Sequence, residues 1–214
     1  MAVWRLCMFE FGDLRFRPME REDLKLLHEW ENDSETMMYS RSRPLNFASM
    51  AQLEKQYEEW VKDEKQQRFI IELADSREAI GIARLEQEHW GYVKTADLGT
   101  YIGNKSLWNK GLGRQITIAL LEMAFYHLNA ERCDAWSVEY NRRAHVVLEA
   151  CGFRKSGMAR QSHFVDGKKW DDFHFDILRE EYLEKRMELL KQTLGDRLDE
   201  YSRRNRAIEE NLRK

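Results

Sequence analysis

The chain has 214 residues, of which 43% are hydrophobic and 34% are charged, and its formal net charge is −3. This composition excludes a collagen-like, low-complexity or disordered chain, and the near balance of charge gives no reason to expect nucleic acid as a partner. The longest run without Asp, Glu, Lys or Arg, residues 44–53, is too short to cross a bilayer, which takes about 20 residues.

The start of the chain and its cysteines indicate the cellular compartment. Arg5 and Glu10 interrupt the apolar N-terminal stretch, so no secretory signal is visible. The three cysteines, Cys7, Cys133 and Cys151, form no CxxC pair, and an odd, widely spaced set is no disulfide framework. We therefore expect a cytoplasmic protein with reduced thiols and no membrane partner.

The first half of the chain predicts strands and helices in an irregular order. A helix is expected to open at residues 20–23, with Leu24, Leu27 and Trp30 on its apolar face, and a second helix is expected over residues 47–62. The expected strands cover residues 14–17, 68–73, 79–87 and 95–103.

In the second half, a loop at residues 104–113 leads into a helix over residues 114–128. A further helix over residues 142–150 ends before Gly152. Asp166 and Gly167 predict a hairpin turn. The expected strands cover residues 132–138, 153–158, 161–165 and 170–178. This order predicts an α/β protein with a mixed sheet.

The end of the chain differs in character, because residues 179–214 carry many charges and no proline. We expect a domain over residues 1–180 and a charged helical extension over residues 181–214, interrupted at Gly195. Apolar residues spaced by 3 and 4 form one helical stripe, which predicts a partner surface. Pairing with a second subunit, with Asn205 in the seam, is favoured over docking on the chain's own domain or a frayed tail. The stripe consists of Leu183, Met187, Leu190, Leu194, Leu198, Tyr201, Ile208 and Leu212.

The segment from Trp108 to Gln115 follows an expected strand and begins a helix. Backbone N–H groups at such a turn converge, and the helix N-terminus adds partial positive charge, so the segment predicts a phosphate site unless it is an ordinary turn. A Walker loop is excluded because Lys110 precedes Gly111, and a dinucleotide fingerprint is excluded because Ile116 replaces its third glycine. The pyrophosphate loop of coenzyme A enzymes remains.

A second segment, which begins at Asn141, follows the next strand. Asn141 stands where a residue caps a helix, and a cap needs no further function. Because this position comes about 30 residues after the glycine loop, we favour a role for Asn141 in the same site.

Together, these segments resemble the GCN5-related N-acetyltransferase (GNAT) superfamily, in its branch of ribosomal-protein and spermidine acetyltransferases. The resemblance extends from about Leu14 to Tyr182. It implies the acetyltransferase fold, with a mixed and mostly antiparallel sheet flanked by helices, here with a C-terminal helical extension. The segments that carry it are LRFRPMEREDLKLLHEWEND, AIGIARLEQ, TADLGTYIGNKSLWNKGLGRQ, NRRAHVVLEACGF and SGMARQSHFVDGKKWDDFHFDILREE.

The resemblance implies acetyl-CoA as cosubstrate. The strand backbone would pair with the pantetheine arm, the amides of the glycine loop would hold the pyrophosphate, and Asn141 would bond the arm. In chain order these residues are Thr100, Tyr101, Ile102, Lys110, Gly111, Leu112, Gly113, Arg114, Gln115 and Asn141. One departure matters, because the tyrosine that many members use as a general acid falls at Leu148, which cannot donate a proton.

The chemistry also needs a base, because a primary amine has a pKa of ~10 and is cationic at neutral pH. Asp97 is the first candidate. It lies 14 residues before Gly111, the spacing of the catalytic glutamate in the histone acetyltransferase branch. Glu86, on the neighbouring strand, is the second candidate. A structural role for Asp97, bonded to backbone, is the alternative.

We therefore expect an acetyl-CoA-dependent N-acetyltransferase in which a primary amine attacks the thioester directly. The acceptor stays open between a polyamine such as spermidine, a protein N-terminus and an amino sugar or antibiotic. The alternative function is that of a non-catalytic acyl-CoA-binding or scaffold protein, which works through its C-terminal helix. No metal is expected, because the histidines show no HExxH or Cys/His ligand spacing.

Overall fold

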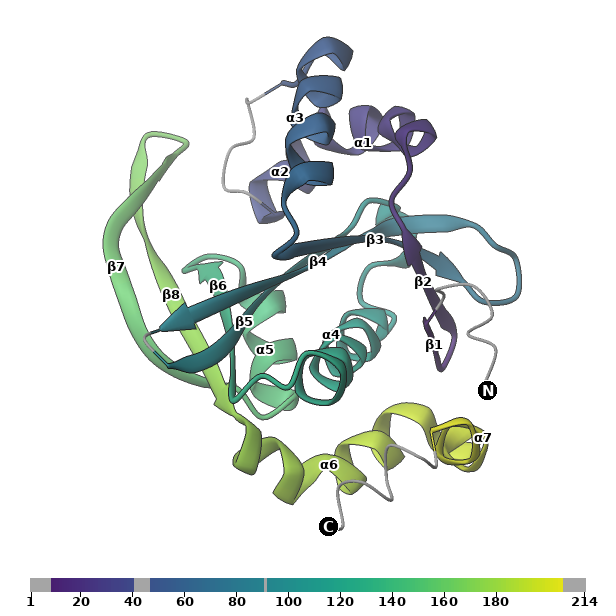
Figure 1. The fold of residues 1–214 in the computed structure, drawn as a ribbon. Coiled ribbons are helices and arrows are strands. Elements are labelled where there is room, and N and C mark those ends of the chain that lie inside the picture. Colours follow the sequence, from purple (N-terminus) through teal and green to yellow (C-terminus); the bar gives the residue numbers. More distant parts are fainter. Residues whose placement is uncertain (1–8, 41–46, 91, 206–214) are drawn as a thin grey trace.

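An open sheet forms the centre of the structure, a computed structural model that describes residues 9–40, 47–90 and 92–205. The eight strands of this sheet lie in the order β1-β2-β3-β4-β5-β6-β8-β7 (Figure 1). Neighbouring strands are antiparallel except for β5 and β6, which are parallel. The mixed, mostly antiparallel sheet is thus confirmed. The strands are β1 (Phe9–Phe11), β2 (Leu14–Pro18), β3 (Gln66–Leu73), β4 (Ala79–Trp90), β5 (Val93–Ile102), β6 (Arg132–Val138), β7 (Arg154–Val165) and β8 (Lys168–Leu178).

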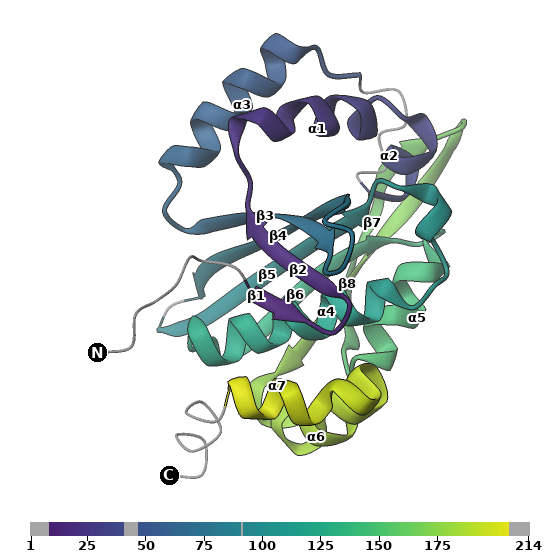
Figure 2. The ribbon, with the colours of Figure 1, turned by 90° about the vertical axis from the view of Figure 1, so that its right-hand side faces the viewer.

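Helices cover both faces of the sheet (Figures 1 and 2). The upper face, in the orientation of Figure 1, is covered by α1 (Leu24–Glu31), α2 (Ser34–Ser40) and α3 (Met50–Lys62). The lower face is covered by α4 (Leu112–Glu122) and α5 (Arg142–Ala150). Below α4 lie α6 (Arg179–Leu194) and α7 (Leu198–Arg204), which form a further layer. No helix in the described ranges is long and apolar enough to cross a membrane.

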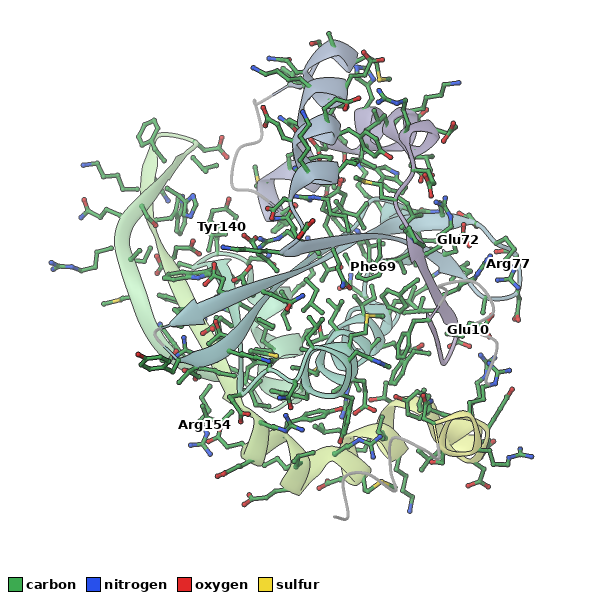
Figure 3. All side chains as sticks on the ribbon, in the orientation of Figure 1. Glu10, Phe69, Glu72, Arg77, Tyr140 and Arg154 are labelled. Atoms are coloured by element: carbon green, nitrogen blue, oxygen red, sulfur yellow. The ribbon has the colours of Figure 1, made fainter. Side chains whose placement is uncertain are left out.

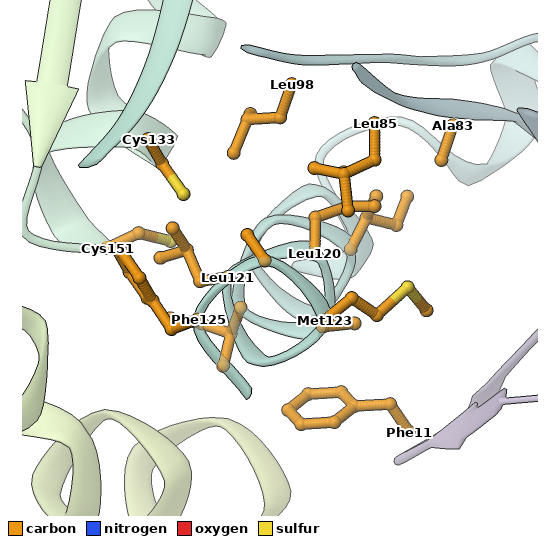
Figure 4. Packing of buried hydrophobic residues seen from close by; sticks show 14 of the residues in the cluster. Phe11, Ala83, Leu85, Leu98, Leu120, Leu121, Met123, Phe125, Cys133 and Cys151 are labelled. Carbon is orange, nitrogen blue, oxygen red and sulfur yellow. The ribbon is translucent and has the colours of Figure 1, made fainter. Parts of the chain in front are cut away.

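The alternation of side chains along the strands decides which face is apolar. On β4, Ala83 and Leu85 point down into the large core around α4, where they meet Leu120 (Figure 4). Ile82 points up into the smaller core beneath α1 and α3. The next positions on the upper face are Arg84 and Glu86, so the upper face becomes polar where these helices no longer cover it.

The parallel strands β5 and β6 separate halfway along. They pair only where Thr95, Ala96 and Asp97 lie opposite residues 132–134, although both strands continue beyond that point. The edge of β5 that faces β6 is therefore open from Leu98 onward. The indole Nε1 of Trp108 donates a hydrogen bond to the carbonyl oxygen of Ile102 (2.8 Å) and closes the far end of this opening.

The structure adds two elements that the sequence did not predict, β1 and α2. β1 has three residues, too few to show an alternation, and α2 follows directly after α1. The strands expected at 153–158 and 161–165 form one strand, β7, whose register shifts where Gln161 takes a left-handed conformation (φ 52°). The predicted turn at Asp166 and Gly167 is present, and both residues have positive φ.

The C-terminal extension packs against its own chain. Its anchor is Glu122 of α4, which is 2% exposed and accepts hydrogen bonds from Tyr182, Arg186 and Tyr201. These bonds direct the side chains of Tyr182 and Arg186 toward the core. The predicted interruption of the extension at Gly195 is present, because Gly195 ends α6 with a φ of 53°. The core is continuous across residue 180, and the division of the chain at that position stays a prediction.

The predicted stripe therefore describes only part of the buried face. Its buried members are Leu190, Leu194 and Tyr201. Its exposed members are Leu183 and Met187, while Ile208 and Leu212 lie outside the described residues. Asn205 donates to the carbonyl oxygen of Tyr201 at the end of α7. Pairing of this extension with a second subunit stays a prediction.

Candidate active site

A cavity of about 800 Å³ lies where β5 and β6 separate. Its walls come from these two strands, from the beginnings of α4 and α5, and from α2. The predicted residues that it brings together are Asp97, Thr100, Tyr101, Ile102, Gly111, Gly113 and Asn141. The candidate base, the open strand edge and the glycine turn thus border one space, although they come from different elements.

The other predicted residues direct their side chains elsewhere. Leu112 is buried in the core, the guanidinium of Arg114 donates to Gln192 of α6, and the amide of Gln115 bonds Asp13 in the β1–β2 turn. Lys110, Leu112, Arg114, Gln115 and Glu86 are not among the cavity-lining residues. The role predicted for the loop residues is that their backbone amides hold a pyrophosphate. The positions of their side chains do not exclude this role.

The glycine turn has the backbone of an anion site. Gly111 adopts φ 80° at the N-terminus of α4, and no side chain caps this helix end. The N–H groups of Arg114 and Gln115 donate to the carbonyl oxygen of Gly111, whereas the amides at the very start of a helix have no intrahelical acceptor. A Cβ atom on Gly111 would have no neighbour within 4 Å. The helix end therefore offers N–H groups and partial positive charge to open space.

Two arginines at the start of α5 extend the positive end of the cavity. Arg142 and Arg143 both line it. The guanidinium of Arg143 lies between the rings of Tyr39 and Trp108, with its Cζ atom 4.2 and 4.4 Å from the two ring centroids. This part of the site was missed, because Tyr39 belongs to a helix that shows no signal in the sequence. An anionic group is favoured here.

Asn141 ties α5 to α2. Its Oδ1 accepts from the N–H of Ala144 (3.3 Å), as the predicted cap does, and its Nδ2 donates to the carbonyl oxygen of Tyr39 (2.8 Å). The neighbouring Tyr140, labelled in Figure 3, donates its hydroxyl to the carbonyl oxygen of Met38 (2.8 Å). Asn141 is thus both a helix cap and a wall of the cavity.

The opposite end of the cavity carries carboxylates on the upper face. Glu86, Asp97 and Asp134 lie opposite one another on β4, β5 and β6. The guanidinium of Arg84 forms ion pairs with Glu86 and Asp97. Burial raises the pKa of Asp97 to about 6, and the nearby carboxylates, including Glu88, act in the same direction while Arg84 opposes them. Asp97 therefore gains and loses its proton close to neutral pH, as a general base requires.

Two histidines stand beside this acidic end. His163 and Asp172 line the cavity, and the Nε2 of His163 lies 3.0 Å from the Oδ2 of Asp172. His174 contacts Asp134, with 2.9 Å between the Nε2 of His174 and the Oδ1 of Asp134, but this contact does not have the geometry of a hydrogen bond. Within the described ranges, His, Cys, Asp and Glu form no group of three or more that could hold a metal ion.

Neither described cysteine has the properties of a nucleophile. Burial raises the pKa of Cys151 to about 12 and holds that of Cys133 well above its ordinary value. The thiolate is the reactive form, so these pKa shifts disfavour attack by either thiol at neutral pH. Leu148, which stands where the family that the sequence resembles often has a tyrosine acid, lines the cavity and offers no proton.

Comparisons with known proteins identify relatives of this chain. The family model described as acetyltransferase (GNAT) domain matches residues 13–154. The chain is 27% identical over 172 residues to spermidine N(1)-acetyltransferase of Vibrio cholerae, covering 80% of this chain and 96% of that protein. It is 24% identical to the enzyme of the same name from Escherichia coli K12, covering 79% and 88%. The crystal structure of the Vibrio cholerae spermidine N-acetyltransferase in complex with CoA and spermine matches with a TM-score of 0.72 at 26% identity, covering 80% of this chain and 98% of that one.

These matches confirm the predicted family and cosubstrate. The family model spans the glycine turn and the segment of Asn141, and the named relatives favour catalysis over the non-catalytic scaffold. The chain belongs to the acetyltransferase (GNAT) family and is an acetyl-CoA-dependent N-acetyltransferase.

Proposed function

We propose that the acceptor is a small cationic amine of the polyamine class. The carboxylate of Asp97, which lines the cavity beside the open strand edge, carries this proposal, because its negative charge would attract a cationic acceptor. Glu86 and Asp134 lie opposite Asp97 on the neighbouring strands and would add to this charge from outside the cavity wall. Relatives that are named as spermidine N-acetyltransferases support the same class. The opposite, basic end of the cavity suits the phosphates of the cosubstrate.

We assign the binding of acetyl-CoA to the residues that resemble the family's motifs. The helix start at Gly111–Gly113 would hold the pyrophosphate, and the open edge of β5 at Thr100–Ile102 would pair with the pantetheine arm. Arg142 and Arg143 would add positive charge toward the phosphates. Asn141 would bond the arm with the amide that faces Tyr39 in the free protein.

Asp97 is the proposed base. The amine nitrogen attacks the thioester carbon after passing one proton to the carboxylate of Asp97, directly or through water. A strand N–H near Tyr101 or Ile102 would stabilise the oxyanion. The C–S bond then breaks, the nitrogen loses its remaining excess proton to water, and the leaving thiolate takes a proton from water because Leu148 has none to give. Glu86 lies beside Asp97 but outside the cavity wall, so it is the second candidate.

A turnover assay tests the proposed function. Purified full-length protein is incubated with acetyl-CoA and a panel of spermidine, spermine, simple alkylamines, an amino sugar and a peptide with a free N-terminus, and released thiol is measured. We expect kcat/KM to be highest for the polyamines. Turnover confined to the peptide or the amino sugar, with acetyl-CoA bound normally, would overturn the proposed acceptor class.

A further inference from the structure

An exposed aromatic ring stands in the middle of the sheet. Trp136 belongs to β6, which lies between β5 and β8, and it lines the cavity. It is 52% exposed, whereas its neighbours along the strand, Ala135 and Ser137, are buried. A large apolar side chain in contact with water is unfavourable, and tryptophan combines a wide apolar surface with a polar edge that suits binding. The ring is therefore available to a ligand in the cavity.

Trp136 lies on the same face of the sheet as the carboxylates. Side chains two residues apart on a strand share a face, so Trp136 shares the face of Asp134, which stands opposite Asp97. The ring centroid of Trp136 lies 4.6 Å from that of His174, which is directly opposite on β8. The glycine turn begins α4, which covers the other face (Figure 1). The ring thus lies with the acidic end of the cavity and apart from the glycine turn.

Carboxylates stand on both sides of this ring along the strands. Asp134 precedes Trp136 by two residues, and Asp172 lies two residues from His174 in the opposite direction. Each is displaced from the ring by about 7 Å along the strand. Asp134 pairs with Arg132 (3.1 Å) outside the cavity wall, whereas Asp172 lines the cavity together with Trp136. An aromatic face with a carboxylate on the same wall is suited to an organic ammonium group.

The ring suits one kind of acceptor nitrogen. The nitrogen that attacks the thioester has to lose its proton, and an aromatic face would favour the protonated form. A nitrogen that stays charged throughout the reaction has no such conflict. We propose that Trp136 is an acceptor-binding residue whose ring holds a charged nitrogen of the polyamine other than the one that is acetylated. This inference rests on the proposed function, because it names how the same site recognises its acceptor.

Steady-state kinetics with spermidine test the inference. Trp136→Leu keeps an apolar side chain but removes the aromatic face, and Trp136→Phe restores an aromatic face. Rates are expressed per acetyl-CoA-binding site, counted by calorimetry, so that any loss of folded protein cancels. We expect kcat/KM for spermidine to fall roughly 3- to 30-fold in Trp136→Leu, mainly through KM. Trp136→Phe should recover most of this loss.

Tyr92→Leu is the matched control, because Tyr92 is a fully exposed aromatic residue outside the cavity wall and its loss should leave kcat/KM unchanged. n-Butylamine, which carries the reacting nitrogen alone, should lose less than twofold in Trp136→Leu. A change below twofold for spermidine, or an equal loss for both amines, overturns the inference alone. A Trp136→Leu protein without acetyl-CoA-binding sites also overturns it, because the ring would then serve the cosubstrate or the fold. A wild type that binds acetyl-CoA but does not acetylate spermidine overturns the proposed function itself.

Discussion

The buried carboxylate of Glu122 joins the C-terminal extension to the core. Removing its partner Arg186 should therefore lower the free energy of unfolding. Arg186 donates to both oxygens of Glu122 at 2.8 Å, and the two side chains are 7% and 3% exposed. Arg186→Met keeps an unbranched apolar stem but no guanidinium, and among the described residues it leaves Glu122 with the hydroxyls of Tyr182 (2.5 Å) and Tyr201 (2.6 Å).

The magnitude follows from this burial. Removing one partner of a buried ion pair costs about 3–5 kcal/mol, because the remaining charge has lost its compensation. For a domain of about 200 residues, this loss of free energy of unfolding corresponds to a fall in Tm of roughly 6–20 °C. In the double variant Glu122→Gln/Arg186→Met the uncompensated charge is gone, so most of the loss should be recovered.

Urea denaturation followed by circular dichroism measures the free energy of unfolding of each variant. Arg197→Met is the matched control: Arg197 pairs with Asp13 at 2.7 Å, but both side chains are about half exposed, and such surface pairs contribute 0–1 kcal/mol. A loss below about 1 kcal/mol for Arg186→Met, equal to that of the control, would refute the reasoning.

Three further predictions concern the site and the extension. Asp97→Asn should lower kcat/KM by roughly 10²–10⁴-fold. The pH–rate profile of the variant should also lack the fall in activity below about pH 6, since the wild type gains activity as Asp97 loses its proton. Rates that match the wild type over pH 6–9 would contradict this prediction. Because burial raises the pKa of this acid, the folded state binds its proton more tightly than the unfolded state does. Stability therefore falls as the pH rises from about 4 to 6, and Asp97→Asn should not lower Tm at pH 7. Gly113→Ala should weaken acetyl-CoA binding, measured by calorimetry, because the Cβ of the new alanine would lie on the cavity wall. The protein should not lose stability, because this Cβ would lie at an ordinary 3.5 Å from Val147 and alanine favours a helix. Undiminished affinity would argue against a phosphate at this turn. Truncation after Glu181 removes Arg186 and Tyr201 and should abolish cooperative unfolding. If the truncated protein is stable, and light scattering shows only a change from oligomer to monomer, the result would instead support the pairing role of the extension.

The sequence predicted what depends on local pattern. The glycine turn and the cap at Asn141 are properties of neighbouring residues, whereas the spacing of Asp97 gained its meaning from the family resemblance. The elements of all three lie where they were expected. Arg84 escaped notice because an arginine in an alternating strand is typical of a solvated face. Only the register between β4 and β5 places it beside Asp97.

The extension shows a limit of the same kind. Spacing of 3 and 4 identified a helix with one apolar face, but the choice between two adjacent faces depends on Glu122, which lies 60 residues before Tyr182. A polar residue in a distant helix leaves no periodic signal in the tail. The contact of Tyr39 with Arg143 was missed for the same reason.

The enclosure of α4 has a consequence for motion during turnover. Every residue from Ile116 to Glu122 is buried, because the sheet lies on one side of the helix and α6 and α7 on the other. Amide exchange with solvent should be slowest there, so the helix that begins at Gly111 acts as a rigid floor. Across the cavity, hydrogen bonds from Tyr140 and Asn141 hold α2 by its carbonyl groups. We expect the adjustments that admit the cosubstrate to involve these bonds, because Asn141 would leave the carbonyl oxygen of Tyr39 to bond the pantetheine arm.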